Sequence, residues 1–197
     1  MLDITSSLEQ DRTNEVFVWH DEDYPIDLTF DNVLRWFNLI DDSSIDQAGK
    51  VLLSFAMFVG DGLDVPFDQQ QVEVGRISNM LFQDPYNPGS GGSRSFDYQQ
   101  DSEAIYASFM KDYGIDLMKV KGHMSYFEFR ALFNNLSDNA PINQIIQIRK
   151  ENPSAHADNP EYVRSLMTQK AVYELHMTAE QRERETEAQI AQAFESL

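Results

Sequence analysis

Apolar side chains recur at helical spacing along most of this 197-residue chain, and they predict a series of short helices. Before the first helix, β-branched and aromatic residues flank the polar letters HDED, which predicts a hairpin that pairs Val16–Trp19 with residues 24–26. The segment TFDNVLRWFNLI then predicts a helix that begins at Thr29 or Asp31, either of which suits an N-cap. Its apolar stripe is expected to contain Val33, Leu34, Phe37 and Ile40.

The clearest amphipathic pattern in the first half is SSIDQAGKVLLSFAMFVG. Ser44 and Gln47 have the spacing of a capping box, and Gly60 suits the position just after a helix. The face toward the core is expected to contain Ile45, Ala48, Leu52, Phe55, Ala56 and Val59. A third helix is predicted in PFDQQQVEVGRISNMLFQDP and should end before Pro85.

Prolines and glycines in PYNPGSGGSR predict a flexible loop near residues 85–95 that separates two helical halves. After it, a helix is expected over residues 98–113, with Gly114 at its end and its carboxylates facing solvent. Ser125 and Glu128 form a second capping box before the aromatic segment YFEFRALFNNL, and Pro141 suits the first turn of the next helix. Asn159 with Pro160 predicts the start of a terminal helical region.

These elements predict a mainly α fold of about six to seven helices with a small N-terminal β-hairpin. Residues 1–152 are interpreted as a helical core domain, 153–160 as a linker and 161–197 as a C-terminal helical extension. The predicted core side chains are Trp36, Phe37, Phe55, Ile105, Phe109, Phe127, Phe129, Leu132 and Ile145. The extension is too polar for burial in one domain, so its apolar stripe, Ile190, Phe194 and Leu197, is the predicted partner-binding surface.

The charge of the chain restricts its partners. A net charge of -18 opposes binding to nucleic acid or to anionic lipid. No apolar run is long enough to span a bilayer, and the N-terminus lacks the features of a signal peptide, so the cytoplasm is the expected location. Eight methionines are either core filler or part of an adaptable binding surface.

No pattern of catalytic or metal-binding residues is recognisable. The chain has no cysteine, and its four histidines are not paired at HxxH or HxxxH spacing. The pairs Asp101 with Glu103 and Asp112 with Asp116 are interpreted as parts of a solvated helix face rather than as an acid and a base. No enzymatic activity, metal or cofactor is therefore expected.

The order of several segments resembles the bacteriophage gene-product-fifteen family of tailed phages and prophages of Gram-positive bacteria. The segments are YPIDLTFDNVLRWFNLIDD, GKVLLSFAMF, FDYQQDSEAIYASFMKDYGIDL, MSYFEFRALFNNL and INQIIQIRK, and the likeness covers roughly residues 24–150. A tryptophan that is usual in that family is replaced here by aromatic residues in HMSYFEF. The resemblance carries no catalytic residues.

The resemblance implies a tail-assembly chaperone that binds the tape-measure protein and assists polymerisation of the tail tube. Such a protein keeps the apolar helices of its partner soluble and is absent from the finished virion. Its expected partners are the tape-measure and tail-tube proteins, with self-association as a further option. A structural minor tail protein and an acidic DNA mimic that inhibits a host protein remain as alternatives.

Overall fold

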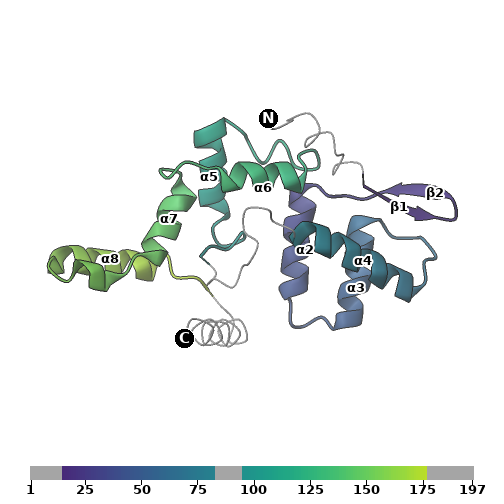
Figure 1. The fold of residues 1–197 in the computed structure, drawn as a ribbon, viewed down its shortest axis with the longest axis horizontal. Helices are drawn as coiled ribbons and strands as arrows, with labels where there is room; N and C mark the ends of the chain where they lie inside the picture. The colour runs from purple at the N-terminus through teal and green to yellow at the C-terminus, as the bar shows by residue number, and fades with distance from the viewer. Residues whose placement is uncertain (1–14, 83–94, 177–197) are drawn as a thin grey trace, which may run out of the picture. The chain divides into compact units, whose positions relative to one another are not determined.

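The computed structural model describes residues 15–82 and 95–176, and over these ranges the protein is mainly α-helical (Figure 1). The described elements are β1 (Val16–Trp19), β2 (Glu22–Pro25), α2 (Phe30–Asp41), α3 (Gln47–Phe58), α4 (Phe67–Phe82), α5 (Ser102–Tyr113), α6 (Tyr126–Asn134), α7 (Pro141–Lys150), the 3-10 helix η1 (Pro153–His156) and α8 (Pro160–Val172). The predicted fold class, with its N-terminal hairpin and a helix after residue 160, is confirmed.

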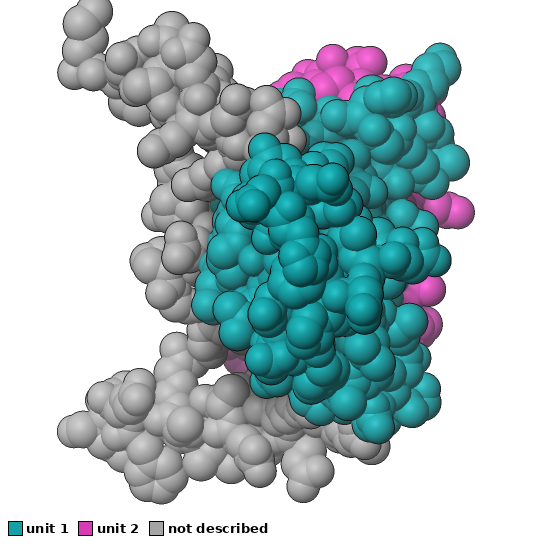
Figure 2. Space-filling view, turned by 90° about the vertical axis from the view of Figure 1, so that its right-hand side faces the viewer, with its two compact units in different colours: residues 1–86, 118–132 teal, residues 87–117, 133–197 magenta. Residues whose placement is uncertain are grey.

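The chain divides into two compact units, distinguished by colour in Figure 2. Unit 1 comprises residues 1–86 and 118–132, and unit 2 comprises residues 87–117 and 133–197. Helix α6 therefore begins in unit 1 and ends in unit 2. The predicted division at residues 152 and 160 stays a prediction, and most of the loop near residues 85–95 lies outside the described residues.

The hairpin of unit 1 closes through a two-residue turn. Trp19 pairs with Glu22 in the antiparallel register, and the turn residues His20 and Asp21 have φ angles of 52° and 63°. A two-residue turn with positive φ at both residues has a twist that matches the twist of the two strands, which is why hairpins favour it. Of the polar letters HDED, only His20 and Asp21 form the turn. Glu22 and Asp23 belong to β2, so the second strand begins two residues earlier than predicted.

Aromatic side chains form the core of unit 1. Phe17 of the hairpin meets Phe55 of α3 edge to face, and Trp36 of α2 lies 5.3 Å from Phe58 between ring centroids. The indole N–H of Trp36 donates to the hydroxyl of Ser54 at 2.8 Å, which satisfies both polar groups inside the core. These contacts position α3 with one face against α2 and β1.

The segments that precede α2 and α6 are joined by a short stretch of strand-like pairing. Thr29 pairs with Ser125, the N–H of Phe30 donates to the carbonyl of Met124, and the N–H of Tyr126 donates to the carbonyl of Leu28. Two helices far apart in the sequence therefore begin side by side, and the rings of Phe30 and Phe129 stack at 5.0 Å.

The prediction for α3 was wrong in its start and in its inward face. Asp46 caps the helix by accepting from the N–H of Gly49, whereas the hydroxyl of Ser44 donates to Asp42 and takes no part in a capping box. Gly60 follows the helix as predicted, with φ of 108°. The buried face is Val51, Ser54, Phe55 and Phe58, so only Phe55 of the predicted stripe is buried.

Unit 2 is built around α5 and α7, which pack against each other. Ile105 and Phe109 of α5 and Ile142 of α7 are buried. The hydroxyl of Ser108, also buried, accepts from the N–H of Ile142 at 3.1 Å and donates to the carbonyl of Ala104. This serine therefore takes part in the packing of α5 against α7.

Helix α5 begins four residues later than predicted because Asp97 binds the backbone that precedes it. The side chain of Asp97 accepts from the N–H groups of Gln99 and Gln100, which keeps those residues in a turn. At the other end, Gly114 adopts a left-handed conformation with φ of 68°, as predicted. The expectation that the carboxylates face solvent was wrong for Asp101, whose side chain is 5% exposed.

Five of the nine predicted core side chains are buried, namely Trp36, Phe55, Ile105, Phe109 and Phe129. The other four are half-buried, namely Phe37, Phe127, Leu132 and Ile145. Two other predicted helix starts have side-chain caps, since Ser125 accepts from the N–H of Glu128 and Asn159 accepts from the N–H of Tyr162. Thr29 is the N-cap residue of α2, but its side chain makes no capping hydrogen bond.

Candidate functional site

Helix α3 of unit 1 has a second apolar face that points away from the core. Leu52 and Leu53 are 47% and 46% exposed, Ala48 is exposed and Ala56 is half-buried. At 100° per residue, this face lies about a third of a turn from the buried face of Val51, Ser54 and Phe58. It includes Ala48, Leu52 and Ala56, which periodicity predicted to face inward. We call Ala48, Leu52, Leu53 and Ala56 the outer face of α3.

The segments on both sides of the outer face are strongly acidic. Residues 41–68 contain six aspartates, Asp41, Asp42, Asp46, Asp61, Asp64 and Asp68, and a single lysine, Lys50. All six aspartates are exposed, whereas the ammonium of Lys50 donates to the backbone carbonyl of Ile40 at 2.6 Å. Hydrogen bonds from Ser44 lower the pKa of Asp42, so this carboxylate stays ionised near neutral pH.

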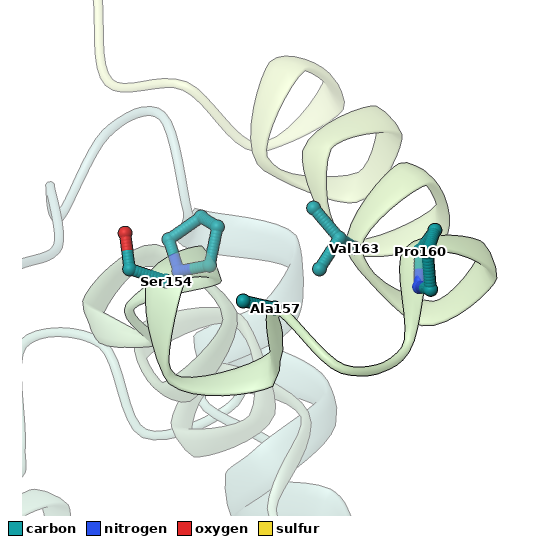
Figure 3. Close-up of a pocket in the computed structure, with 5 residues that line it drawn as sticks. Ser154, Ala157, Pro160 and Val163 are labelled. Atoms are coloured by element: carbon teal, nitrogen blue, oxygen red, sulfur yellow. The ribbon is translucent and has the colours of Figure 1, made fainter.

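Unit 2 offers a different surface along α8. A hollow of about 360 Å³ lies between η1 and α8 and is lined by Pro153, Ser154, Ala157, Pro160 and Val163. Figure 3 shows Val163 extending from α8 toward the side of η1 and Ala157. The lining is almost wholly apolar, so the hollow suits an aliphatic side chain rather than a charged ligand.

Glu151 fastens η1 to α8 beside this hollow. Its carboxylate accepts from the hydroxyl of Tyr162 at 2.7 Å and lies 2.8 Å from Nε2 of His156. The hydrogen bond to Glu151 raises the pKa of Tyr162 above its usual value, so the phenol remains protonated. The contacts are structural, since they hold the two helical segments that form the hollow.

A second hollow of about 400 Å³ lies farther along α8. It is lined by Arg149, Met167, Lys170, Ala171, Glu174 and Leu175. Met167 is 53% exposed and Val172 is 70% exposed, so neither belongs to the core. Leu166 is the buried apolar anchor of α8.

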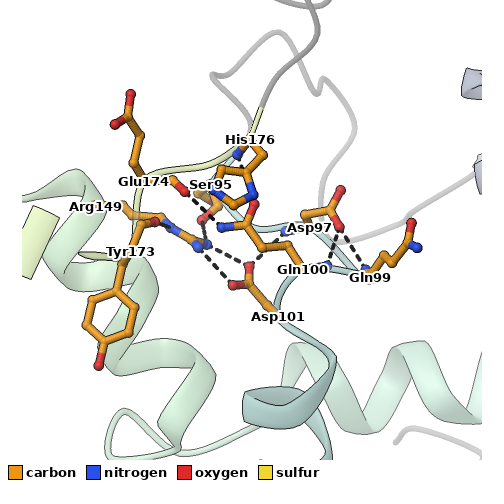
Figure 4. A network of polar contacts seen from close by, with 9 residues as sticks. All are labelled: Ser95, Asp97, Gln99, Gln100, Asp101, Arg149, Tyr173, Glu174 and His176. Atoms are coloured by element: carbon orange, nitrogen blue, oxygen red, sulfur yellow. Dashed lines mark hydrogen bonds and ion pairs between the residues drawn. The ribbon is translucent and has the colours of Figure 1, made fainter. Parts of the chain in front are cut away.

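Arg149, which lines this hollow, forms a bidentate ion pair with Asp101, with N–O distances of 2.6 and 2.8 Å (Figure 4). The side chains are 9% and 5% exposed. Arg149 also donates to the carbonyls of Tyr173 and Ser95. One guanidinium therefore joins the start of α5, the end of α7 and the segment after α8.

The same network contains two further contacts to the segment after α8. The side chain of Gln100 donates to the carbonyl of Glu174 and accepts from the N–H of His176. Because Asp101 is occupied by Arg149 and by the N–H of Asp97, it is placed to hold structure rather than to transfer protons. Among residues 15–82 and 95–176, no three His, Asp or Glu side chains gather closely enough to bind a metal ion.

The predicted partner-binding residues Ile190, Phe194 and Leu197 lie outside the described residues, and their role stays a prediction. Three methionines, Met110, Met118 and Met167, are exposed, while Met124 is buried. Sequence reasoning missed Leu53, whose apolar character next to Leu52 was the available signal for a second face. It also missed Arg149, for which the sequence offers no local signal.

Comparison with known proteins identifies one family. A model of the family described as Bacteriophage Gp15 protein matches residues 11–175. The match confirms the resemblance noted over residues 24–150 and extends it at both ends, past Asn152 into α8. No match was found among curated proteins or among solved structures. None of the helices in the described part of the chain has the length and apolar character needed to cross a membrane.

Proposed function

We propose, since this chain belongs to the bacteriophage Gp15 protein family, that it is a tail-assembly chaperone. Family membership indicates a phage protein of structure or morphogenesis. Within that class, the proposed role is to bind the tape-measure protein in the cytoplasm of the host, to keep its apolar helices soluble and to assist polymerisation of the tail-tube protein. The protein then leaves before the virion is complete.

The observation that carries this proposal is the combination of half-exposed leucines with a strongly acidic surface. A protein that holds apolar helices needs apolar side chains that its own core does not use, and the outer face of α3 supplies them. It also needs like charge to keep the loaded complex dispersed, and the net charge of -18 supplies that.

Quantitative mass spectrometry of phage-infected cells and of purified virions tests this role. The chain should co-purify with the tape-measure protein from infected cells and should fall below one copy per particle in virions. The tail-tube protein of the same virions serves as the internal standard. Stoichiometric amounts of the chain in virions would instead establish the alternative, a structural minor tail protein.

A further inference from the structure

The outer face of α3 has the dimensions of a helix-binding site. Ala48, Leu52 and Ala56 follow one another at four-residue spacing along a helix of 12 residues, which is about 18 Å long. Two small side chains thus flank one large side chain, and Leu53 widens the face beside it. A ridge of this shape fits the groove of a second helix that lies along it.

The core of unit 1 does not require this face. Val51, Phe55 and Phe58 are buried on the adjacent face of α3, where the helix meets α2, α4 and the hairpin. At the start of the helix, the side chains of Asp46 and Ile45 lie close to Gly49, at 3.0 and 3.1 Å from the position of an added Cβ. The ridge of Ala48, Leu52 and Ala56 continues along the helix from there, with Leu52 at its centre.

Charge determines which kind of helix fits. Asp42 and Asp46 lie before the ridge, and Asp61 and Asp64 lie after it. Lys50 is the one cation among residues 41–68, and its ammonium binds the carbonyl of Ile40, so it offsets only a small part of this negative charge. A second copy of this chain would bring the same aspartates against these, so like-charge repulsion opposes a homodimer through this face.

The geometry points to an amphipathic helix with lysine or arginine on both flanks of its apolar stripe as the occupant of the outer face of α3. The inference rests on the proposed function in one respect, that the helix belongs to the tape-measure protein. The chemistry of the surface itself defines the occupant: leucine-sized side chains against Leu52 and Leu53, and cations opposite the aspartates at each end.

A peptide probe tests the surface independently of the natural partner. The probe is a synthetic 18-residue helix of leucine, alanine and lysine, and its control has the same composition in an order that destroys the apolar stripe. The full chain should bind the striped peptide and not the scrambled one. The double variant L52Q/L53Q should bind it about tenfold or more weakly, because each leucine has roughly half of its surface left to bury.

Matched variants distinguish binding at the outer face of α3 from general attraction of a basic peptide to an acidic protein. L52Q/L53Q leaves the net charge unchanged, and M167Q alters an equally exposed apolar side chain on α8. Circular dichroism checks that each variant is folded. Equal binding by wild type and L52Q/L53Q, or loss of binding in M167Q alone, would overturn the inference.

The charged part of the inference is tested by D61N/D64N. This variant should weaken binding of the striped peptide and reduce its dependence on salt concentration, since fewer carboxylates attract the lysines. An unchanged salt dependence would show that the aspartates take no part and would overturn the choice of a basic helix.

The natural occupant is identified by a photo-crosslinking phenylalanine analogue placed at Leu53 in the full chain during infection. A crosslink to a lysine- or arginine-flanked segment of the tape-measure protein supports the inference. A crosslink to a second copy of this chain, or to its own residues 177–197, overturns it. If the striped peptide binds but the tape-measure protein neither crosslinks nor co-purifies, the surface stands and the proposed function fails.

Discussion

Replacing Asp101 by asparagine is expected to lower the free energy of unfolding by about 3–5 kcal/mol. The substitution keeps the shape of the side chain but leaves the guanidinium of Arg149 inside unit 2 without a counter-charge. The magnitude applies because both side chains are less than a tenth exposed and the pair is bidentate. An exposed ion pair would contribute far less.

Replacing Arg149 by methionine is expected to cost more than replacing Asp101. This substitution leaves the carboxylate of Asp101 without its counter-charge and also removes the donor to the carbonyls of Ser95 and Tyr173. Each lost hydrogen bond adds about 1 kcal/mol. The double variant D101L/R149M should be less destabilised than the sum of the single variants, since neither charge is then left alone.

Urea denaturation followed by far-ultraviolet circular dichroism measures these changes. Both tryptophans, Trp19 and Trp36, belong to unit 1, so their fluorescence reports on that unit separately. The control is E15Q, which removes only one of the two ion pairs of Arg76 in unit 1 and leaves its pair with Glu73 in place. The Arg76 and Glu15 side chains are 43% and 29% exposed, so this variant should change stability by about 1 kcal/mol or less. A D101N variant no less stable than E15Q would refute the reasoning.

Three further predictions follow from single contacts. Ser54→Ala should lower the free energy of unfolding by about 1–3 kcal/mol in a urea titration followed by tryptophan fluorescence, because it leaves the buried indole N–H of Trp36 without an acceptor; unchanged stability would contradict this. Gly114→Ala should cost about 1–2 kcal/mol in thermal unfolding, since φ of 68° strains an alanine. The lowered pKa of Asp42 means that its contribution to stability is present above the unfolded pKa of about 3.9 and is lost as pH falls through the folded pKa. Ser44→Ala should raise the pKa of Asp42 in an NMR titration, and an unmoved pKa would show that the hydroxyl is not its cause.

Helix ends were predictable where one residue decides them. Gly60 and Gly114 adopt positive φ, and Asn159 caps α8, because each of these signals acts within a few residues. The prediction of where α3 starts was wrong because Ser44 and Asp46 both have side chains able to cap a helix. The hydroxyl of Ser44 is taken by Asp42, which leaves Asp46 as the cap.

The inward face of α3 was not predictable from periodicity alone. The helix has two apolar faces, and a stripe that contains Leu52 fits the pattern as well as one that contains Val51. Tertiary contacts decide which face of α3 is buried, since Phe17 packs on Phe55 and Trp36 packs near Phe58. The outer face is therefore found only when the fold is known.

The burial of Asp101 was not predictable either, because it also depends on tertiary contacts. Its partner Arg149 lies 48 residues away in the sequence, so no local spacing relates the two. A carboxylate at the start of a helix with a polar face is ordinarily exposed, and the prediction followed that rule. The ion pair appears only when α7 and the segment after α8 come together around it.

The solubility of the tape-measure protein on co-expression tests the central claim most directly. Sedimentation of cell lysates should leave the tape-measure protein in the soluble fraction when the wild-type chain is present, and in the pellet when the chain is absent or carries L52Q/L53Q. M167Q should keep it soluble. A tape-measure protein that pellets equally with and without the wild-type chain would contradict the account.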